Sequence, residues 1–142
     1  MSNYNQISSF IWNVCDDVLR GLFKPHEYGD VILPFTVLRR LDCTLESHKD
    51  EVYEIYEKYK SQVEDPTPII LNKINTNFFN HSKYDLTRLK SDPQNINLNF
   101  QNYIGGYSDN VVEIIENFQF DKPVQKLHKS NRLYQLIDKF TE

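Results

Sequence analysis

The sequence predicts a compact, mainly α-helical domain of about six to eight helices, with at most a minor short strand pairing near residues 78–85. Apolar residues recur at steps of three and four along most of the chain, as one face of an α-helix requires. Residues that open or close helices, such as Asp92-Pro93 and Gly105-Gly106, fall between these stretches. Because the chain has 142 residues, 39% of them hydrophobic, we expect residues 1–142 to form a single domain with a real core.

The first two predicted helices are the most strongly patterned part of the chain. The first ends near Gly21, a residue suited to a left-handed cap, and its inward face comprises Ile7, Phe10, Ile11, Val14 and Val18. The second lies within YGDVILPFTVLRRLDCTL, residues 28–45, and its inward stripe comprises Val31, Ile32, Phe35, Leu38, Leu41 and Leu45. Asp30 can cap this helix. Pro34 then falls in the first turn or just beyond, where its missing N–H costs little.

Shorter elements are predicted in the middle of the chain. A third helix ends at EDPTP, residues 64–68, and its inward face comprises Val52, Ile55, Tyr56, Tyr59 and Val63. Residues 69–77 indicate a short helix. Residues 78–85 look irregular, with a brief extended pairing around Phe79 and Tyr84.

The last third again shows helical spacing. Asp85 can cap the short helix LTRLK, and Asp92-Pro93 is typical of a cap followed by proline at the first helical position. The helix that follows is closed by Gly105-Gly106, and the next one comprises Val111, Val112, Ile114, Ile115 and Phe118. Ser130 is predicted to cap a final helix, which directs inward Leu133, Leu136, Ile137 and Phe140.

The overall charge and the chain ends limit the possible functions. A net charge of −4 argues against an independent nucleic-acid binder, so a role on DNA needs a local basic patch or other subunits. No apolar run approaches the roughly 18 residues that span a bilayer, and the N-terminus lacks a signal peptide, so we expect no membrane association and a cytoplasmic location. Because Glu142 directly follows a predicted helix, we expect a piece of a longer chain.

Glycines, cysteines and histidines give no sign of a cofactor or metal site. The four glycines match neither a dinucleotide-binding turn nor a phosphate-binding loop. No close pair with zinc-ligand spacing occurs among Cys15, His26, Cys43 and His48. Both cysteines lie in apolar helical patterns, so we expect buried, reduced thiols rather than a disulfide.

Catalytic residues are not predicted either. Asp16 and Asp17 are adjacent on a helix and therefore point about 100° apart, so they do not converge as an acid–base pair. We expect at least one of them to face solvent or to pair with Arg20. No serine occupies a nucleophile elbow. The residues of this chain do not indicate an enzyme.

The basic residues of the second helix are the remaining candidates. Arg39 and Arg40 lie off the apolar stripe, so at least one points away from the core. They either pair locally with Asp42 or Glu46, or contact a phosphate backbone or an acidic partner surface. Lys24 in the preceding connector could extend such a patch.

The segment FIWNVCDDVLRGLFKPHEYGDVILPFTVLRRLDCTLE, residues 10–46, closely resembles the start of the modification (DNA adenine-N6 methyltransferase, HsdM) subunits of type I restriction–modification systems. The matching motifs are Ile11-Trp12, Leu19-Arg20-Gly21, Glu27-Tyr28, Ile32-Leu33-Pro34 and Leu38-Arg39-Arg40-Leu41-Asp42. NFQNYIGGYSDNVVEIIENFQF and the final LYQLIDKF resemble later segments that precede the catalytic domain of the family. Cys15 stands where the family often has alanine.

The resemblance implies the N-terminal helical domain of such a subunit, without its catalytic domain. Neither Asp65-Pro66 nor Asp92-Pro93 continues into the methyltransferase motif, because Thr and Gln follow. S-adenosylmethionine would serve the parent subunit and not this piece. The implied partners are the specificity subunit, a second modification subunit, the restriction subunit and duplex DNA. On this basis Arg20, Lys24, Arg39 and Arg40 are predicted to contact DNA or a neighbouring subunit.

Two other functions remain open on the sequence. One is a stand-alone helical interaction or regulatory module without any methyltransferase. The other is a small metal-dependent hydrolase, for which the sequence lacks a ligand cluster.

Overall fold

The computed structural model describes the backbone of residues 2–141 and the side chains of residues 5–141. Its α-helices are α1 (Ser2–Val14), α2 (Tyr28–Leu45), α3 (Lys49–Tyr59), α4 (Thr67–Ile74), α5 (Leu86–Leu89), α6 (Ile96–Gly105), α7 (Asp109–Phe118), α8 (Asp121–Lys129) and α9 (Leu133–Phe140). A π-helical turn (Cys15–Leu19) continues α1, and 3₁₀ turns (Pro25–Glu27, Glu46–His48, Pro93–Asn95) precede α2, α3 and α6. No strand or membrane-length apolar helix occurs in the described part, which confirms the predicted fold class.

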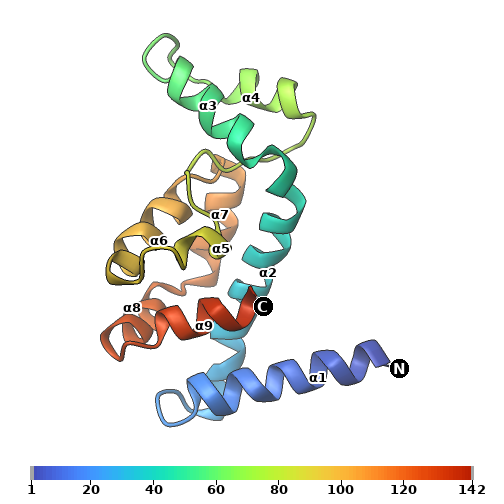
Figure 1. The fold of residues 1–142 in the computed structure, drawn as a ribbon, viewed down its shortest axis with the longest axis vertical. Coiled ribbons are helices and arrows are strands. Elements are labelled where there is room, and N and C mark those ends of the chain that lie inside the picture. Colours follow the sequence, from blue (N-terminus) through green and yellow to red (C-terminus); the bar gives the residue numbers. More distant parts are fainter. Residues whose placement is uncertain (1, 142) are drawn as a thin grey trace.

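The long helix α2 is the element around which the others are arranged (Figure 1). The helices α5 to α9 gather along α2, while α3 and α4 lie at one end of the molecule and α1 at the other (Figure 1). The main core contains Phe35 and Leu38 of α2 together with Phe100, Leu127 and Leu136 of the later helices. A second, smaller core joins α3 to α4 and comprises Val52, Ile70, Ile74 and Phe79.

The N-terminal helix differs from the prediction. Phe10 is partly buried, its ring centroid 5.1 Å from that of Phe140, and Val14 is fully buried. Ile7 and Ile11, expected in the core, are 60% and 40% exposed. Figure 1 shows the N-terminal half of α1 extending beyond the other described helices, which agrees with the exposure of these two side chains. Gly21 adopts the expected left-handed conformation, with φ of +82°.

The start of α2 also lies elsewhere than predicted. The helix begins at Tyr28, directly after the turn Pro25–Glu27, so Asp30 belongs to its first turn and does not cap it. Pro34 is therefore inside the helix and buried. It removes one backbone hydrogen bond, and the buried apolar stripe around it keeps the helix continuous.

Smaller corrections concern the ends of other helices. The helix α3 ends at Tyr59, which leaves Val63 in a turn and 37% exposed, and Ile114 of α7 is 51% exposed. Asp92 and Pro93 take the predicted cap and first positions of the turn Pro93–Asn95 before α6. The Asp92 side chain makes no cap hydrogen bond there, because its carboxylate accepts from the side chains of Asn95 and Asn99. Asp85 caps α5 as predicted, because its Oδ1 accepts from the Arg88 N–H at 2.7 Å.

The helix α8 has no counterpart in the sequence prediction. Only Val124 and Leu127 are buried in it, so its apolar face is short, and polar or charged residues make up most of the segment. Ser130, the predicted cap of the last helix, instead follows α8. Asn131 then turns the chain with φ of +60°, and α9 begins at Leu133.

The irregular segment 78–85 pairs with residues 106–108, which follow α6. An antiparallel bridge joins Asn80 to Tyr107. The segment therefore pairs with residues farther along the chain, and not within itself around Phe79 and Tyr84 as predicted. Gly106 lies against this segment with φ of −83°, so its role is to allow a close approach and not a left-handed turn. A Cβ atom there would lie 2.7 Å from both Asn80 Oδ1 and the Ser82 nitrogen.

We predict that Gly106→Ala lowers the free energy of unfolding by about 1–3 kcal/mol, because the backbone of Ser82 cannot move aside cheaply. The adjacent Gly105→Ala is the matched control: nothing lies within 4 Å of its added Cβ, so it should be neutral or stabilise by at most about 1 kcal/mol. Urea unfolding of both variants measures the difference. Equal stability of the two variants would contradict the close packing at Gly106.

Candidate functional site

The four predicted contact residues lie in two separate places. Arg39 and Arg40 belong to the second half of α2, whereas Arg20 and Lys24 belong to the connector that precedes it. The structure therefore gives each pair its own surroundings.

A local ion pair does not explain the arginines of α2. Asp42 is buried and hydrogen-bonded to Tyr103 and Tyr107, so the predicted alternative of an Arg–Asp42 pair is wrong. Among the side chains of residues 5–141, no ion pair joins Arg39 or Arg40 to a carboxylate, and this includes Glu46. Arg39 makes one long hydrogen bond, from Nη1 to Thr87 Oγ1 at 3.4 Å.

Arg39 and Arg40 instead line an apolar groove of about 500 Å³ between α1 and α2, which we call the α1–α2 groove. Its apolar wall comprises Ile7, Phe10, Ile11, Ile32 and Phe140. Arg40 is exposed and Arg39 half-buried. The groove thus combines an uncovered apolar surface with two cations.

Arg20 and Lys24 lie close to α8. The guanidinium of Arg132, just before α9, donates to the carbonyl oxygens of Val18 at 2.9 Å and of Arg20 at 3.2 Å. The ammonium of Lys126 lies 4.8 Å from the centroid of the Phe23 ring. These contacts join the connector, α8 and the start of α9 into one surface.

Three lysines follow the outer side of α8. Lys122, Lys126 and Lys129 stand at positions i, i+4 and i+7, a spacing that aligns them on one face of a helix. All three are exposed and line a shallow depression, opposite the buried side of α8. We call the surface of these lysines together with Arg20, Lys24 and Arg132 the basic face.

Two carboxylates lie near the lysines of the basic face. Asp121 lies in the same depression as the lysines, and Glu27 interacts electrostatically with Lys126, His26 and Lys24. The pKa of Glu27 is lowered, mainly because its Oε1 accepts the Lys24 backbone N–H at 2.8 Å and then because of these cations. Within the described side chains, none of the six cations forms an ion pair, so the face keeps a positive charge.

Of the residues of the basic face, only Arg20 and Lys24 were predicted from the sequence as contact residues. The lysine stripe was missed because α8 was missed. The signal was present in DKPVQKLHK, in which the lysines have helical spacing around Val124 and Leu127.

The structure also places the aspartates and cysteines that were considered as candidate site residues. Asp17 pairs with Lys139, at 2.9 Å between Oδ2 and Nζ, and not with Arg20, while Asp16 is exposed. Both cysteines are free thiols, but only Cys15 is buried, and burial followed by the Asp16 charge raises its pKa. Cys43 is exposed, which corrects the prediction of a core position. No metal-holding group of His, Cys, Asp and Glu occurs within the described residues.

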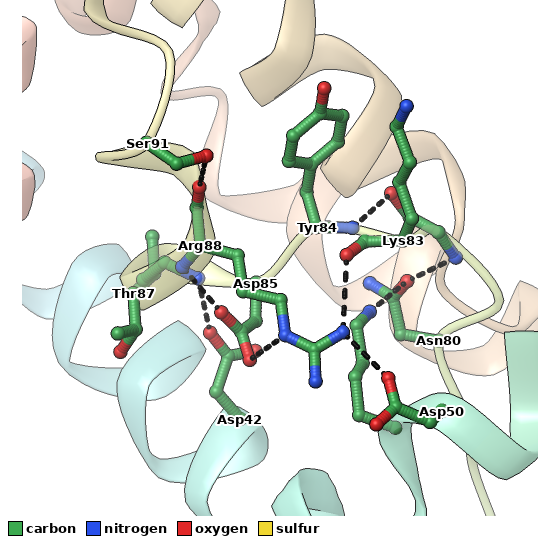
Figure 2. A network of polar contacts seen from close by, with 12 residues as sticks. Asp42, Asp50, Asn80, Lys83, Tyr84, Asp85, Thr87, Arg88 and Ser91 are labelled. Atoms are coloured by element: carbon green, nitrogen blue, oxygen red, sulfur yellow. Dashed lines mark hydrogen bonds and ion pairs between the residues drawn. The ribbon is translucent and has the colours of Figure 1, made fainter.

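A buried polar cluster fixes α2 to the elements that follow it. Asp42 Oδ1 accepts from the hydroxyls of Tyr103 and Tyr107, each at 2.7 Å, and its Oδ2 accepts from the Leu86 N–H at 2.9 Å. Figure 2 shows this carboxylate against the start of α5. Burial raises the pKa of Asp42, whereas the three donors oppose that rise. Burial also raises the pKa values of Tyr103 and Tyr107 well above 10.0, so both hydroxyls keep their protons.

Cations surround the cluster at its outer edge. Lys49 is 4% exposed and donates from Nζ to Asn80 Oδ1 at 3.1 Å. Its pKa is lowered to about 8, mainly by burial and against the attraction of Asp42 and Asp85. Arg88 donates from Nη1 to Asp50 Oδ1 at 2.9 Å. This contact is drawn in Figure 2. Because Asp42 is hydrogen-bonded to Leu86, Tyr103 and Tyr107, this buried cluster fixes the orientation of α2. We call it the structural centre.

The structure is an all-helical domain that carries an apolar groove and a basic face on its surface. A family model described as the HsdM N-terminal domain matches residues 7–140, so the chain belongs to that family. HsdM is the modification subunit of type I restriction–modification systems, which confirms the resemblance found in the sequence. No curated protein and no solved structure matches this chain.

We predict that Asp42→Asn lowers the free energy of unfolding by about 2–3 kcal/mol. Both oxygens of the carboxylate accept hydrogen bonds, so the NH₂ group of asparagine would face either the Leu86 N–H or the tyrosine hydroxyls, and donor would meet donor. Asp50→Asn is the matched control: the Asp50 side chain is 79% exposed, so the same change should cost under about 1 kcal/mol. Urea unfolding at pH 7 compares the variants. Equal losses would show that the Asp42 cluster does not hold the fold.

We further predict that Lys49 makes the free energy of unfolding depend on pH. Its pKa is about 8 in the folded chain and 10.5 as the ordinary value, so between these pH values the unfolded state binds the extra proton. Stability from this group therefore rises with pH from 8 to 10, by an amount on the order of 2 kcal/mol. Lys49→Met should remove the rise in urea unfolding. The same slope in both proteins would contradict the lowered pKa.

Proposed function

We propose that this domain holds duplex DNA within a type I modification methyltransferase by placing its basic face on the phosphate backbone. The observation that supports this proposal is the stripe of Lys122, Lys126 and Lys129, against which the connector that carries Arg20 and Lys24 packs. This proposal uses Arg20 and Lys24, two of the four residues predicted from the sequence as contacts.

Charge distribution supports DNA as the ligand of this face. The chain carries 20 acidic and 16 basic residues, so a face with an excess of cations is a local exception. Lysines that neutralise phosphates release condensed counterions, which gives affinity without sequence preference. The acidic remainder of the surface would repel DNA, and this repulsion favours binding in one orientation.

In this proposal, reading of the target sequence, methyl transfer and positioning of the DNA belong to different parts of the complex. Backbone contacts fix the position of a protein on DNA and carry no sequence information, so the specificity subunit reads the target. The parent modification subunit transfers the methyl group from S-adenosylmethionine to adenine N6, in its catalytic domain. The domain described here positions the DNA for that reaction, together with a second modification subunit and, in the full enzyme, the restriction subunit. Family membership favours this role over a stand-alone regulatory module.

We predict that Lys122→Ala/Lys126→Ala/Lys129→Ala weakens the binding of duplex DNA to the assembled methyltransferase by about 10- to 100-fold at low salt. The slope of log affinity against log salt should fall by about 1 for each lysine that contacts a phosphate. The loss should be similar for target and non-target duplexes, because no base is read. Fluorescence anisotropy at a series of salt concentrations measures both quantities.

Lys58→Ala/Lys73→Ala/Lys83→Ala is the matched control, because these three lysines are exposed and lie outside the basic face. It removes the same charge and should change the salt slope little. Identical effects of the two triple variants would contradict a DNA contact by the basic face. Thermal unfolding of both variants checks that the domain remains folded.

A further inference from the structure

The α1–α2 groove is a second surface, which the DNA-binding proposal does not use. It is lined by residues of α1 and α2 and by Phe140 of α9, and no residue of α8 lines it. Ile7 is 60% exposed and Ile11 is 40% exposed on its α1 side. Side chains of this size lose favourable burial when they face water, so a covering element would stabilise them.

The charges beside the groove limit what can cover it. Arg39 and Arg40 both line it, and within the described side chains neither is paired with a carboxylate. The nearest acid in sequence, Asp42, is occupied by Tyr103 and Tyr107 inside the core. Two guanidinium groups therefore remain available to carboxylates from outside this domain.

We propose that the α1–α2 groove binds an acidic amphipathic helix of another polypeptide in the methyltransferase complex. The apolar face of that helix would cover Ile7, Ile11 and Phe10, and carboxylates on its flank would pair with Arg39 and Arg40. Helix-in-groove binding uses this combination, in which apolar anchors lie at steps of three and four. A phosphate backbone fits less well, because it has no apolar surface to cover the wall of the groove.

The test places a photo-cross-linking residue in the groove of the intact subunit. Gln6→p-benzoylphenylalanine is suitable, because Gln6 lines the groove and is exposed. The subunit is assembled with its specificity subunit, irradiated, and analysed by mass spectrometry. The expected cross-link joins residue 6 to a segment of another polypeptide that has apolar residues at helical spacing and at least two acidic residues. Gln101→p-benzoylphenylalanine, at an exposed glutamine of α6, is the control and should not label that segment.

Charge reversal then tests the chemistry of the contact. Arg39→Glu/Arg40→Glu should lower the cross-link yield at least about tenfold, and exchange of the partner's acidic residues for lysine should restore it. Arg40→Glu alone, at the more exposed arginine, should give a smaller loss in the same direction. Thermal unfolding shows whether each variant is folded.

Three results would overturn the proposal. They are a cross-link confined to the same polypeptide, a cross-link between two copies of this domain, and a yield that charge reversal does not change. Mixing isotope-labelled and unlabelled subunits separates contacts within a copy from contacts between copies. Because the variants leave α8 intact, failure here is distinguishable from failure of the DNA proposal, which depends on the salt slope of the lysine variants.

Discussion

The buried carboxylate of Asp42 is the interaction on which the arrangement of this domain depends. One side chain of α2 accepts hydrogen bonds from the start of α5, from Tyr103 of α6 and from Tyr107 just after α6. Elements more than 40 residues apart in sequence are thereby joined at a single point. Loss of one acceptor would leave a buried donor without a partner, which costs more than the bond itself contributes.

The fixed orientation of α2 explains why the arginines face the groove. Successive helical residues differ by about 100°, so a helix that turns Phe35, Leu38 and Asp42 inward must turn Arg40 outward and place Arg39 at the border. Ile32 lies on the same flank as Arg39. The structural centre and the candidate partner surface are therefore two sides of one helix.

Much of this fold could be predicted from the sequence, and the failures have physical reasons. The stripe of α2 and the Asp85 cap depend on local spacing, which a sequence shows directly. The exposure of Ile7 and Ile11 depends on what lies opposite them, and periodicity carries no information about that. The same limit applies to the basic face, since Lys24 and Lys126 are brought together only by the packing of α8 on the connector.

Hydrogen exchange in the assembled methyltransferase can distinguish the two surfaces, because we propose a different ligand for each of them. We expect assembly without DNA to slow amide exchange in residues 5–14 and 32–40, around the groove. Addition of duplex DNA should then slow exchange in residues 20–27 and 121–132 and leave the groove unchanged. Protection by DNA at the groove, or no added protection in the connector and α8, would contradict the assignment of the two surfaces.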